Sequence, residues 1–201
     1  MPRRVDHEER RRRIAGALWR IASTRGLERA SLREVAAEAG ISLGQLQHYF
    51  AGREEMLRFT LEHFGAVSEQ RIQARLAAGY PEPTPRAVLR EIAAELLPLS
   101  EEQRIGLRVQ LGYFVRVLHD EALRPYAREG ALALRGVLVD QLRLAAGRGE
   151  LVAGADPERE AVLLLALTDG LANAVLLDVL DPERAMDLVD AHLGRLFSGA
   201  G

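Results

Sequence analysis

The chain has 201 residues, of which 48% are hydrophobic and 28% are charged, and its formal net charge is −2. This is the composition of a globular protein, and it argues against a disordered, collagen-like or low-complexity chain. The sequence contains no cysteine, which excludes disulfides, cysteine-ligated zinc and iron–sulfur clusters. The longest unbroken apolar run covers residues 161–167, far short of the ~18 residues that a transmembrane helix needs. We therefore expect a cytoplasmic protein without a membrane span.

The small net charge hides an uneven distribution along the chain. Residues 1–64 hold 12 Arg against 9 Asp and Glu, whereas residues 65–201 hold 15 Arg against 20 Asp and Glu. A basic end on an otherwise acidic chain indicates a polyanionic partner for that end alone. We divide the chain accordingly into an N-terminal domain, residues 1–64, and a C-terminal domain, residues 65–201.

Almost every segment has helical periodicity, and we predict an all-α fold of about nine helices. Most of the helix starts follow from a Ser, Thr or Asp cap, several of them with Glu or Gln three positions later or with Pro at the first helical position. Alternating apolar residues between Ile105 and Leu111 would suit a strand, but polar and apolar residues there segregate at helical spacing. In chain order, the expected helices cover residues 6–25, 32–39, 42–49, 53–78, 85–98, 101–119, 124–146, 157–178 and 182–197.

Residues 31–50, with the sequence SLREVAAEAGISLGQLQHYF, contain two short helices joined by a tight turn. Ala36 is small enough for the second helix to cross the first closely, and Gly40 allows the positive φ of the turn. This spacing favours a DNA-binding helix-turn-helix over a two-helix hairpin inside a helical bundle, which is the alternative. Each helix begins at a serine with the spacing of a capping box (Ser31 with Glu34, Ser42 with Gln45).

Together with its flanks, over about residues 10–60, this segment resembles the TetR family of bacterial transcriptional regulators. Gln47 stands where the family most often has a tyrosine in the recognition helix, so the phosphate contact of that tyrosine is left to His48 or Tyr49. Arg53 stands where the family usually has a lysine, and it keeps a cation that can bind phosphate. The resemblance rests on the first helix ending at Gly26 and on the motifs Ala30-Ser31, Val35-Ala36, Ala39-Gly40-Ile41-Ser42, Gly44, Tyr49-Phe50, Arg53-Glu54 and Leu57.

A helix-turn-helix of this kind places its second helix, residues 42–49, in the major groove of DNA. Gln45 and Gln47 are the candidates for base contacts, since a carboxamide pairs with adenine through two hydrogen bonds. Alternatively, Gln45 serves only to close the capping box. Leu43 can meet a thymine methyl group, and Gly44 allows close approach of the backbone. The predicted DNA-binding residues are Ser31, Ser42, Leu43, Gly44, Gln45, Gln47, His48, Tyr49 and Arg53.

Several residues beside the recognition helix are candidates for contacts with the DNA backbone, and for some of them a second interpretation is open. Ser31, at a helix N-terminus, and Arg53 are expected to hold phosphates and to fix the register on DNA. Arg10–Arg13 fit a solvated helix face and a set of phosphate contacts equally well. Arg3 and Arg4 fit a disordered tail better than an arm in the minor groove.

Residues 65–201 show no catalytic constellation, no metal-ligand spacing and no phosphate-binding loop, and we expect neither an enzyme nor a metal or cofactor site. In the helix from Glu101, the face of Arg104, Arg108, Gly112, Arg116 and His119 is expected to be solvated. Gln110 lies on the opposite, apolar face. Because effectors bind within this domain in the family, the candidate pocket residues are Gln110, Tyr113 and Phe114. A core glutamine with a polar partner is the alternative for Gln110.

The last two helices are expected to form a dimer interface. The helix of residues 157–178 is apolar on all sides between Ala161 and Leu177, and the last helix carries one apolar stripe. Only Thr168, Asp169, Gly170 and Asn173 interrupt the apolar surface of the former. Packing of both helices against a second copy would give a four-helix interface, as the resemblance also implies, whereas burial within one chain is the alternative. A dimer would place two recognition helices about 34–36 Å apart. The stripe consists of Met186, Val189, Leu193 and Phe197.

The sequence thus predicts a homodimeric transcriptional repressor that a small molecule releases from a palindromic operator by shifting the long helix 53–78. The C-terminal half weakly resembles the betaine-operon, choline-responsive branch of the family around Gly149-Glu150-Leu151 and residues 167–171, which alone does not assign choline as the effector. The alternatives are an activator or constitutive DNA-binding protein, and a helical module that binds a small molecule and has no specific affinity for DNA.

Overall fold

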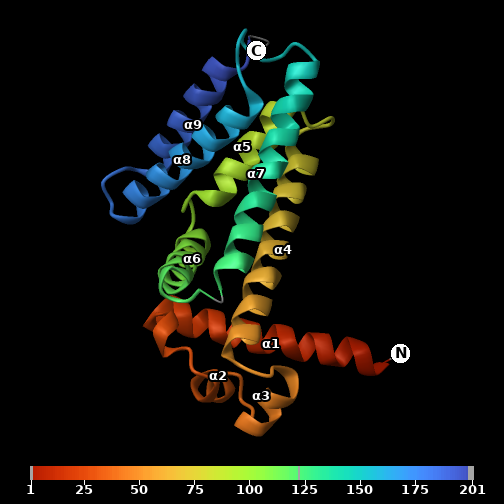
Figure 1. The fold of residues 1–201 in the computed structure, drawn as a ribbon, viewed down its shortest axis with the longest axis vertical. Coiled ribbons are helices and arrows are strands. Elements are labelled where there is room, and N and C mark those ends of the chain that lie inside the picture. Colours follow the sequence, from red (N-terminus) through yellow and green to blue (C-terminus); the bar gives the residue numbers. More distant parts are fainter. Residues whose placement is uncertain (1, 122, 199–201) are drawn as a thin grey trace. The chain divides into compact units, whose positions relative to one another are not determined.

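The computed structural model describes residues 2–121 and 123–198, with side chains described from residue 7 onward, so the side chains of Arg3 and Arg4 lie outside the described part. Over these residues the chain forms nine α-helices and no strand, as predicted, and one short 3-10 helix that was not predicted. No helix in this part is long and apolar enough to cross a membrane. The elements, shown in Figure 1, are α1 (Pro2–Arg25), η1 (Leu27–Arg29), α2 (Leu32–Glu38), α3 (Leu43–Tyr49), α4 (Arg53–Gly79), α5 (Pro85–Leu96), α6 (Glu101–His119), α7 (Arg124–Gly147), α8 (Pro157–Leu176) and α9 (Pro182–Leu196).

Cap residues set several of the helix starts, although two of the expected capping boxes form only in part. At α3, Ser42 and Gln45 make both bonds of the box. Ser31 and Ser100 each accept the expected backbone bond, but the residue three positions later is engaged elsewhere. Glu34 pairs with Arg25 at 3.3 Å, and Gln103 donates to the carbonyl oxygen of Ala94 at 2.8 Å. Contacts with other helices therefore compete with the local bond.

The first helix begins earlier than predicted. The sequence suggested a start at Asp6, whereas α1 begins at Pro2. Proline is well suited to the first helical position, because its fixed φ is helical and its missing N–H would have no partner inside the helix. No glycine or second proline interrupts the chain between Pro2 and Asp6, so the helix extends over these residues.

The chain divides into two compact units, which we describe separately. The N-terminal unit comprises the chain up to Gln70 together with the stretch Arg108–Arg116 of α6. The C-terminal unit comprises Arg71–Leu107 and the chain from Val117 onward. The helices α4 and α6 therefore contribute residues to both units, and the predicted division after residue 64 falls inside α4.

In the N-terminal unit, α1 packs along α2 and α3 through its apolar face. Ile14, Leu18 and Ile21 are at most 2% exposed, which confirms the face predicted for this helix. Trp19 stacks on Phe64 of α4, with the ring centroids 3.7 Å apart. The helix α1 therefore supplies much of the apolar core of this unit.

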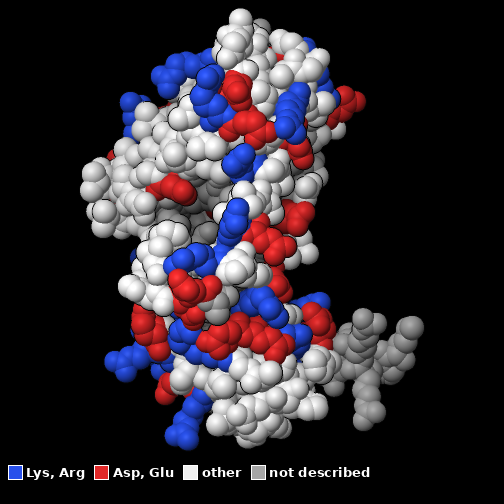
Figure 2. Space-filling model, in the orientation of Figure 1, with Lys and Arg blue, Asp and Glu red and all other residues white. Residues whose placement is uncertain are grey.

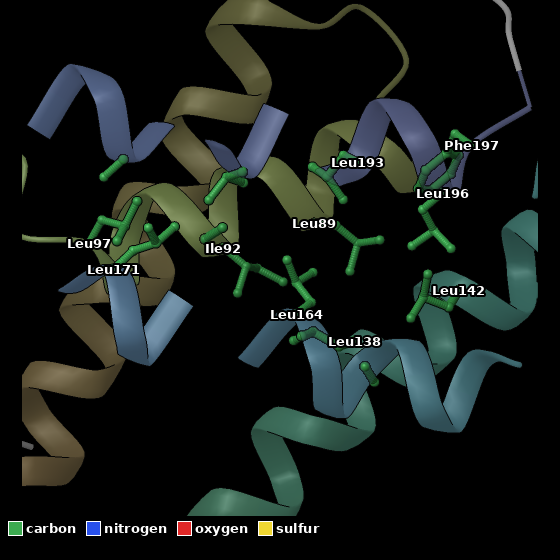
Figure 3. Packing of buried hydrophobic residues seen from close by; sticks show 14 of the residues in the cluster. Leu89, Ile92, Leu97, Leu138, Leu142, Leu164, Leu171, Leu193, Leu196 and Phe197 are labelled. Carbon is green, nitrogen blue, oxygen red and sulfur yellow. The ribbon is translucent and has the colours of Figure 1, made fainter. Parts of the chain in front are cut away.

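The C-terminal unit is built on one large apolar cluster. Figure 3 shows side chains from α5, α7, α8 and α9 converging on this cluster. Leu89, Leu138, Leu142, Leu164 and Leu193 are at most 1% exposed. Complete burial of a leucine side chain contributes about 1.5–3 kcal/mol. These four helices are therefore held together mainly by apolar contacts.

The two helices expected at a dimer interface differ in what they expose. In α9, Val189, Leu193 and Phe197 are buried in the cluster and Met186 packs against it, so the alternative of burial within one chain holds for this stripe. In α8 one face is buried in the same cluster, while the opposite face is open and mostly apolar or small. The exposed residues of α8 include Val162, Leu163, Ala166, Asp169, Gly170 and Asn173.

Candidate nucleic-acid interface

The two short helices of the predicted motif meet in a tight turn. Gly40 has a φ of 69°, the positive value for which glycine was expected. The N–H of Ile41 donates to the carbonyl oxygen of Ala36 at 3.0 Å, which closes the turn onto α2. Val35 and Leu46 are completely buried, so that α2 and α3 cross over apolar residues against α1. The result is a helix-turn-helix (Figure 1, lower part).

The helix α3 presents an uncharged polar surface. Leu46 is its one buried residue, while Gln45, Gln47 and His48 are exposed. The helix contains no Lys, Arg, Asp or Glu, and the lowest part of the N-terminal unit is accordingly white in Figure 2. A Cβ atom added at Gly44 would meet nothing within 4 Å, so this glycine leaves open space at the surface. Such a helix can approach base edges with neutral hydrogen-bonding groups.

The capping box of α3 separates the roles of its two glutamines. The side-chain oxygen of Gln45 accepts a hydrogen bond from the Ser42 N–H at 2.9 Å, and the Ser42 hydroxyl oxygen accepts one from the Gln45 N–H at 3.1 Å. A bidentate contact with adenine requires both the oxygen and the nitrogen of a carboxamide. Gln45 has its oxygen committed to the cap, whereas the carboxamide of Gln47 is exposed. The geometry of Gln45 therefore agrees with the alternative interpretation, in which its side chain closes the capping box.

Four of the predicted residues line one shallow hollow beside α3. They come from three different elements, which the fold brings together: Ser31 caps α2, Leu43 and Gln47 lie on α3, and Arg53 begins α4. The sequence analysis missed Arg33, an exposed cation of α2 that also lines this hollow. Its position next to Leu32, two residues after the cap, is the signal that could have identified it. The hollow is lined by Glu28, Ser31, Leu32, Arg33, Leu43, Gln47 and Arg53.

Arg53 has an internal role in addition to its expected one. Its Nε donates to the carbonyl oxygen of Ala30 at 3.0 Å, and its Nη2 donates to that of Leu27 at 2.8 Å. Partial burial and the nearby Arg116 lower the pKa of Arg53, while Glu54 and Glu28 oppose this shift. The forked guanidinium thus ties the start of α4 to η1, a geometry that the ammonium group of a lysine cannot reproduce.

The arginines of α1 divide between the two interpretations. The Arg11 guanidinium lies over the rings of Phe50 and Phe59, 4.6 and 4.4 Å from their centroids, and pairs with Glu55 at 2.8 Å. It is therefore part of the packing between α1 and α4. Arg12 and Arg13 are exposed, as a set of phosphate contacts or a solvated face would require.

The predicted pocket residues of α6 differ in their burial. Tyr113 is buried together with Val109 and Val117, whereas Gln110 is exposed and Phe114 is 55% exposed. The assignment of Gln110 to a buried face is therefore wrong. The faces expected for α6 hold in part, because Arg108 and His119 are exposed and Val117 is buried. Gly112 and Arg116, expected in solvent, instead have partners. A Cβ added at Gly112 would lie 3.4 Å from that of Leu27, and Arg116 pairs with Glu54 at 2.6 Å.

Comparison with known proteins identifies the family. A sequence model of the C-terminal domain of BetI-type transcriptional repressors matches residues 85–198, and one of bacterial regulatory proteins of the tetR family matches residues 14–58. The chain belongs to the TetR family. It is a DNA-binding transcriptional regulator with a helix-turn-helix, as the resemblance implied. Both halves of the resemblance, including the one to the BetI branch, are confirmed.

Relatives of known sequence and structure agree with this family. The HTH-type transcriptional regulator PksA of Bacillus subtilis (strain 168) is 32% identical over 182 residues, which cover 89% of this chain and 84% of PksA. The crystal structure of a transcriptional regulator from Rhodococcus sp. Rha1 has a TM-score of 0.76 and 30% identity, over 95% of this chain and 99% of that one. A regulator from Saccharomonospora viridis, solved in complex with choline, shares the fold with a TM-score of 0.77 and 21% identity, over 96% of this chain and 100% of that one. These relatives are regulators rather than enzymes. Among the described residues, no group of three or more His, Asp or Glu could hold a metal ion.

Proposed function

We propose that this TetR-family protein is a homodimeric repressor that binds a palindromic operator with one α3 helix in each major groove. The observation that carries the proposal is that the two glutamines of α3 differ in their contacts. Gln45 closes the capping box, whereas Gln47 has its whole carboxamide free for a base. Gln47 is then the base-reading residue, worth about 1–3 kcal/mol of discrimination for a bidentate contact. Ser31, Arg33 and Arg53 beside it would hold phosphates and fix the register.

The proposed dimer is formed mainly by α8. Val162 and Leu163 are each 48% exposed on a helix whose other face is already buried in the core. Exposed apolar residues in a row along one helix favour contact with a second copy over contact with water. Gly170 lies among them and would allow two α8 helices to approach closely. On α9 the small residues Ala191 and Gly194 are also exposed and would extend this surface.

Release from DNA is proposed to act through α6. This helix belongs to the C-terminal unit at both ends and to the N-terminal unit in its middle. There, Arg116 pairs with Glu54 at the start of α4, directly beside Arg53. Arg116 also lowers the pKa of Arg53, after burial, which is the larger cause. An effector that displaces α6 would change the charges around Arg53 and the start of α4, and would lower operator affinity in the sense of a coupling free energy.

The effector is proposed to bind in the C-terminal unit, the part matched by the BetI-type domain. A relative with this fold was solved in complex with choline, so choline is the first compound to test. Its uncharged analogue 3,3-dimethylbutanol has nearly the same shape and serves as the control. A rise in operator dissociation constant with choline alone would assign the cation as the signal.

The central test is binding to the DNA that flanks the protein's own gene, followed by fluorescence anisotropy at several salt concentrations. We expect saturable binding of two protomers per site, a steep salt dependence, and a weaker complex for Gln47→Ala. The matched control is Gln73→Ala, an exposed glutamine of α4 in the C-terminal unit. Equal affinity of the wild-type protein for this DNA and for random DNA would contradict the proposal for this site.

The dimer surface is tested separately with Gly170→Arg. A Cβ at Gly170 meets nothing within 4 Å in the single chain, so the substitution leaves the fold intact and blocks only a partner helix. Gly130→Arg in α7 makes the same change at an exposed helical glycine that also has open space. Sedimentation should show a monomer for Gly170→Arg and a dimer for Gly130→Arg. A dimer in both would place the interface elsewhere.

A further inference from the structure

Three aromatic rings gather at the C-terminal end of α3. His7 of α1 lies 4.9 Å from Tyr49 and 6.4 Å from His48, measured between ring centroids. His48 and Tyr49 are themselves 5.5 Å apart in a T-shaped arrangement. We call His7, His48 and Tyr49 the ring cluster. It exists because α1 begins at Pro2, which makes the segment around His7 helical and brings it against α3.

The ring cluster is not part of the core. His7 and His48 are exposed and Tyr49 is half-buried, whereas the residues on either side, Leu46 and Phe50, are at most 1% exposed and fill the interior. Apolar side chains would pack at such a position as well as imidazoles do. Three rings that each carry a hydrogen-bonding group, placed together in solvent at the end of the recognition helix, therefore point to a ligand outside the chain.

The chemistry of that ligand follows from what α3 lacks. The helix carries no Lys or Arg, so no guanidinium or ammonium group of α3 can hold a phosphate. An imidazole N–H and a phenolic O–H are both donors that suit a phosphate oxygen. Phosphate contacts of this kind orient a protein on the duplex without specifying sequence.

We propose that His7 binds a backbone phosphate of the operator together with His48, at the end of α3 opposite to the capping box, with the Tyr49 ring as the surface against which His7 rests. This contact brings α1 into the interface and supplies a phosphate contact beside a helix that has no Lys or Arg. The inference rests on the proposed function, because it assumes that α3 lies in the major groove. It adds a DNA contact from a helix that sequence analysis assigned only to packing and to its arginines.

The competing explanation is that His7 only packs against Tyr49 and so holds α1 in place. Two substitutions separate the explanations. His7→Phe keeps an aromatic ring against Tyr49 and removes both nitrogens, whereas His7→Ala removes the ring as well. A phosphate contact is lost in both variants, but a packing contact is lost only in His7→Ala.

The experiment measures anisotropy with the operator and with a scrambled duplex of equal length, for wild type, His7→Phe, His7→Ala and His119→Phe. His119 is an exposed histidine of α6 and serves as the control. Since a hydrogen bond to a charged group is a strong one, we expect His7→Phe and His7→Ala to weaken binding at least about tenfold on both duplexes. His119→Phe should bind as the wild type does. Emission of Trp19, the single tryptophan, checks that each variant is folded.

Three results would overturn the inference. Wild-type affinity of His7→Phe together with weak binding of His7→Ala would make His7 a packing residue. A loss by His7→Phe on the operator alone would make it a base contact rather than a phosphate contact. An equal loss in His119→Phe would make the effect a general one of histidine replacement. Failure of the proposed function is distinguishable, because then the wild-type protein itself would not prefer the operator.

Discussion

The two units of this protein both have an apolar core, but they differ in how the elements around it are joined. In the N-terminal unit, arginines tie short elements together: Arg11 to Glu55, Arg53 to the carbonyl oxygens of Leu27 and Ala30, and Arg116 to Glu54. The C-terminal unit is closed by a leucine-rich cluster from α5, α7, α8 and α9. It also has ion pairs, such as Arg75 with Glu91 at 2.7 Å, but these surround a core that apolar contacts already close.

The difference follows from what each unit presents to its partners. A unit that presents an uncharged polar helix to DNA cannot bury that helix in a large core, because half of its surface must stay accessible. Charged hydrogen bonds then add to the contacts of the core. The C-terminal unit has no such requirement on most of its helices, and the exposed face of α8 is the surface proposed for a second copy.

The largest effect is expected in the cluster of the C-terminal unit. Leu164 is 1% exposed at its centre (Figure 3), and Leu164→Ala should lower the free energy of unfolding by about 2–5 kcal/mol, because it removes buried area and leaves a cavity. Leu132→Ala, at a 51% exposed position of α7, should cost less than about 1 kcal/mol. Urea denaturation followed by circular dichroism at one protein concentration measures both. Similar costs for the two variants would mean that the cluster does not dominate this unit.

A smaller effect is expected for the arginine ties of the N-terminal unit. Arg53→Lys keeps the charge but cannot donate to the carbonyl oxygens of Leu27 and Ala30 at once, and should destabilise this unit by about 1–3 kcal/mol. The control Arg58→Lys lies on the same helix, in an exposed ion pair with Glu62 at 3.8 Å, and should change stability by less than about 0.5 kcal/mol. Trp19 emission in urea reports on this unit. An unchanged urea unfolding transition in Arg53→Lys would mean that these hydrogen bonds do not stabilise the N-terminal unit.

The sequence predicts best those features that depend on contacts between residues close together in the chain. The turn at Gly40 and the caps at Ser31 and Ser42 depend on bonds within a few residues, and all three are as predicted. The core face of α1 was also predictable, since an apolar stripe on a first helix has to be buried. These local features place α3 and its exposed glutamines, and hence the centre of the proposed DNA-binding surface.

The rest depends on contacts between residues far apart in sequence. Periodicity shows that α6 has two faces, but not that Arg116, at the edge of the expected solvated face, would meet Glu54 of α4. In the same way, nothing near His7 in the sequence indicates that Tyr49 would lie beside it. The internal contacts of Arg53 were likewise hidden, because its acceptors are the backbone oxygens of Leu27, in a 3-10 helix that the sequence analysis did not predict, and of Ala30, directly after it.

The smallest effect on stability is expected for two histidines. It tests whether the two units unfold independently. Burial, followed by the nearby Arg12 and opposed by Glu8, lowers the pKa of His63 in the N-terminal unit. Burial also lowers the pKa of His192 in the C-terminal unit. In both cases the unfolded chain binds more protons between the lowered native pKa and the usual value of about 6.5. The contribution of each histidine to the free energy of unfolding is therefore complete above about pH 6.5. It decreases as the pH falls through this range.

The substitutions His63→Gln and His192→Gln should each make the free energy of unfolding less dependent on pH in this range. The change in slope is at most about 1.4 kcal/mol per pH unit for one proton. His63 lies 5.3 Å from Phe64, the ring on which Trp19 stacks, so Trp19 emission follows unfolding of the N-terminal unit. If the units unfold independently, His63→Gln changes the pH dependence of this emission and His192→Gln does not. If both variants change it equally, the units unfold together, and the arginine ties and the leucine cluster then contribute to a single stability.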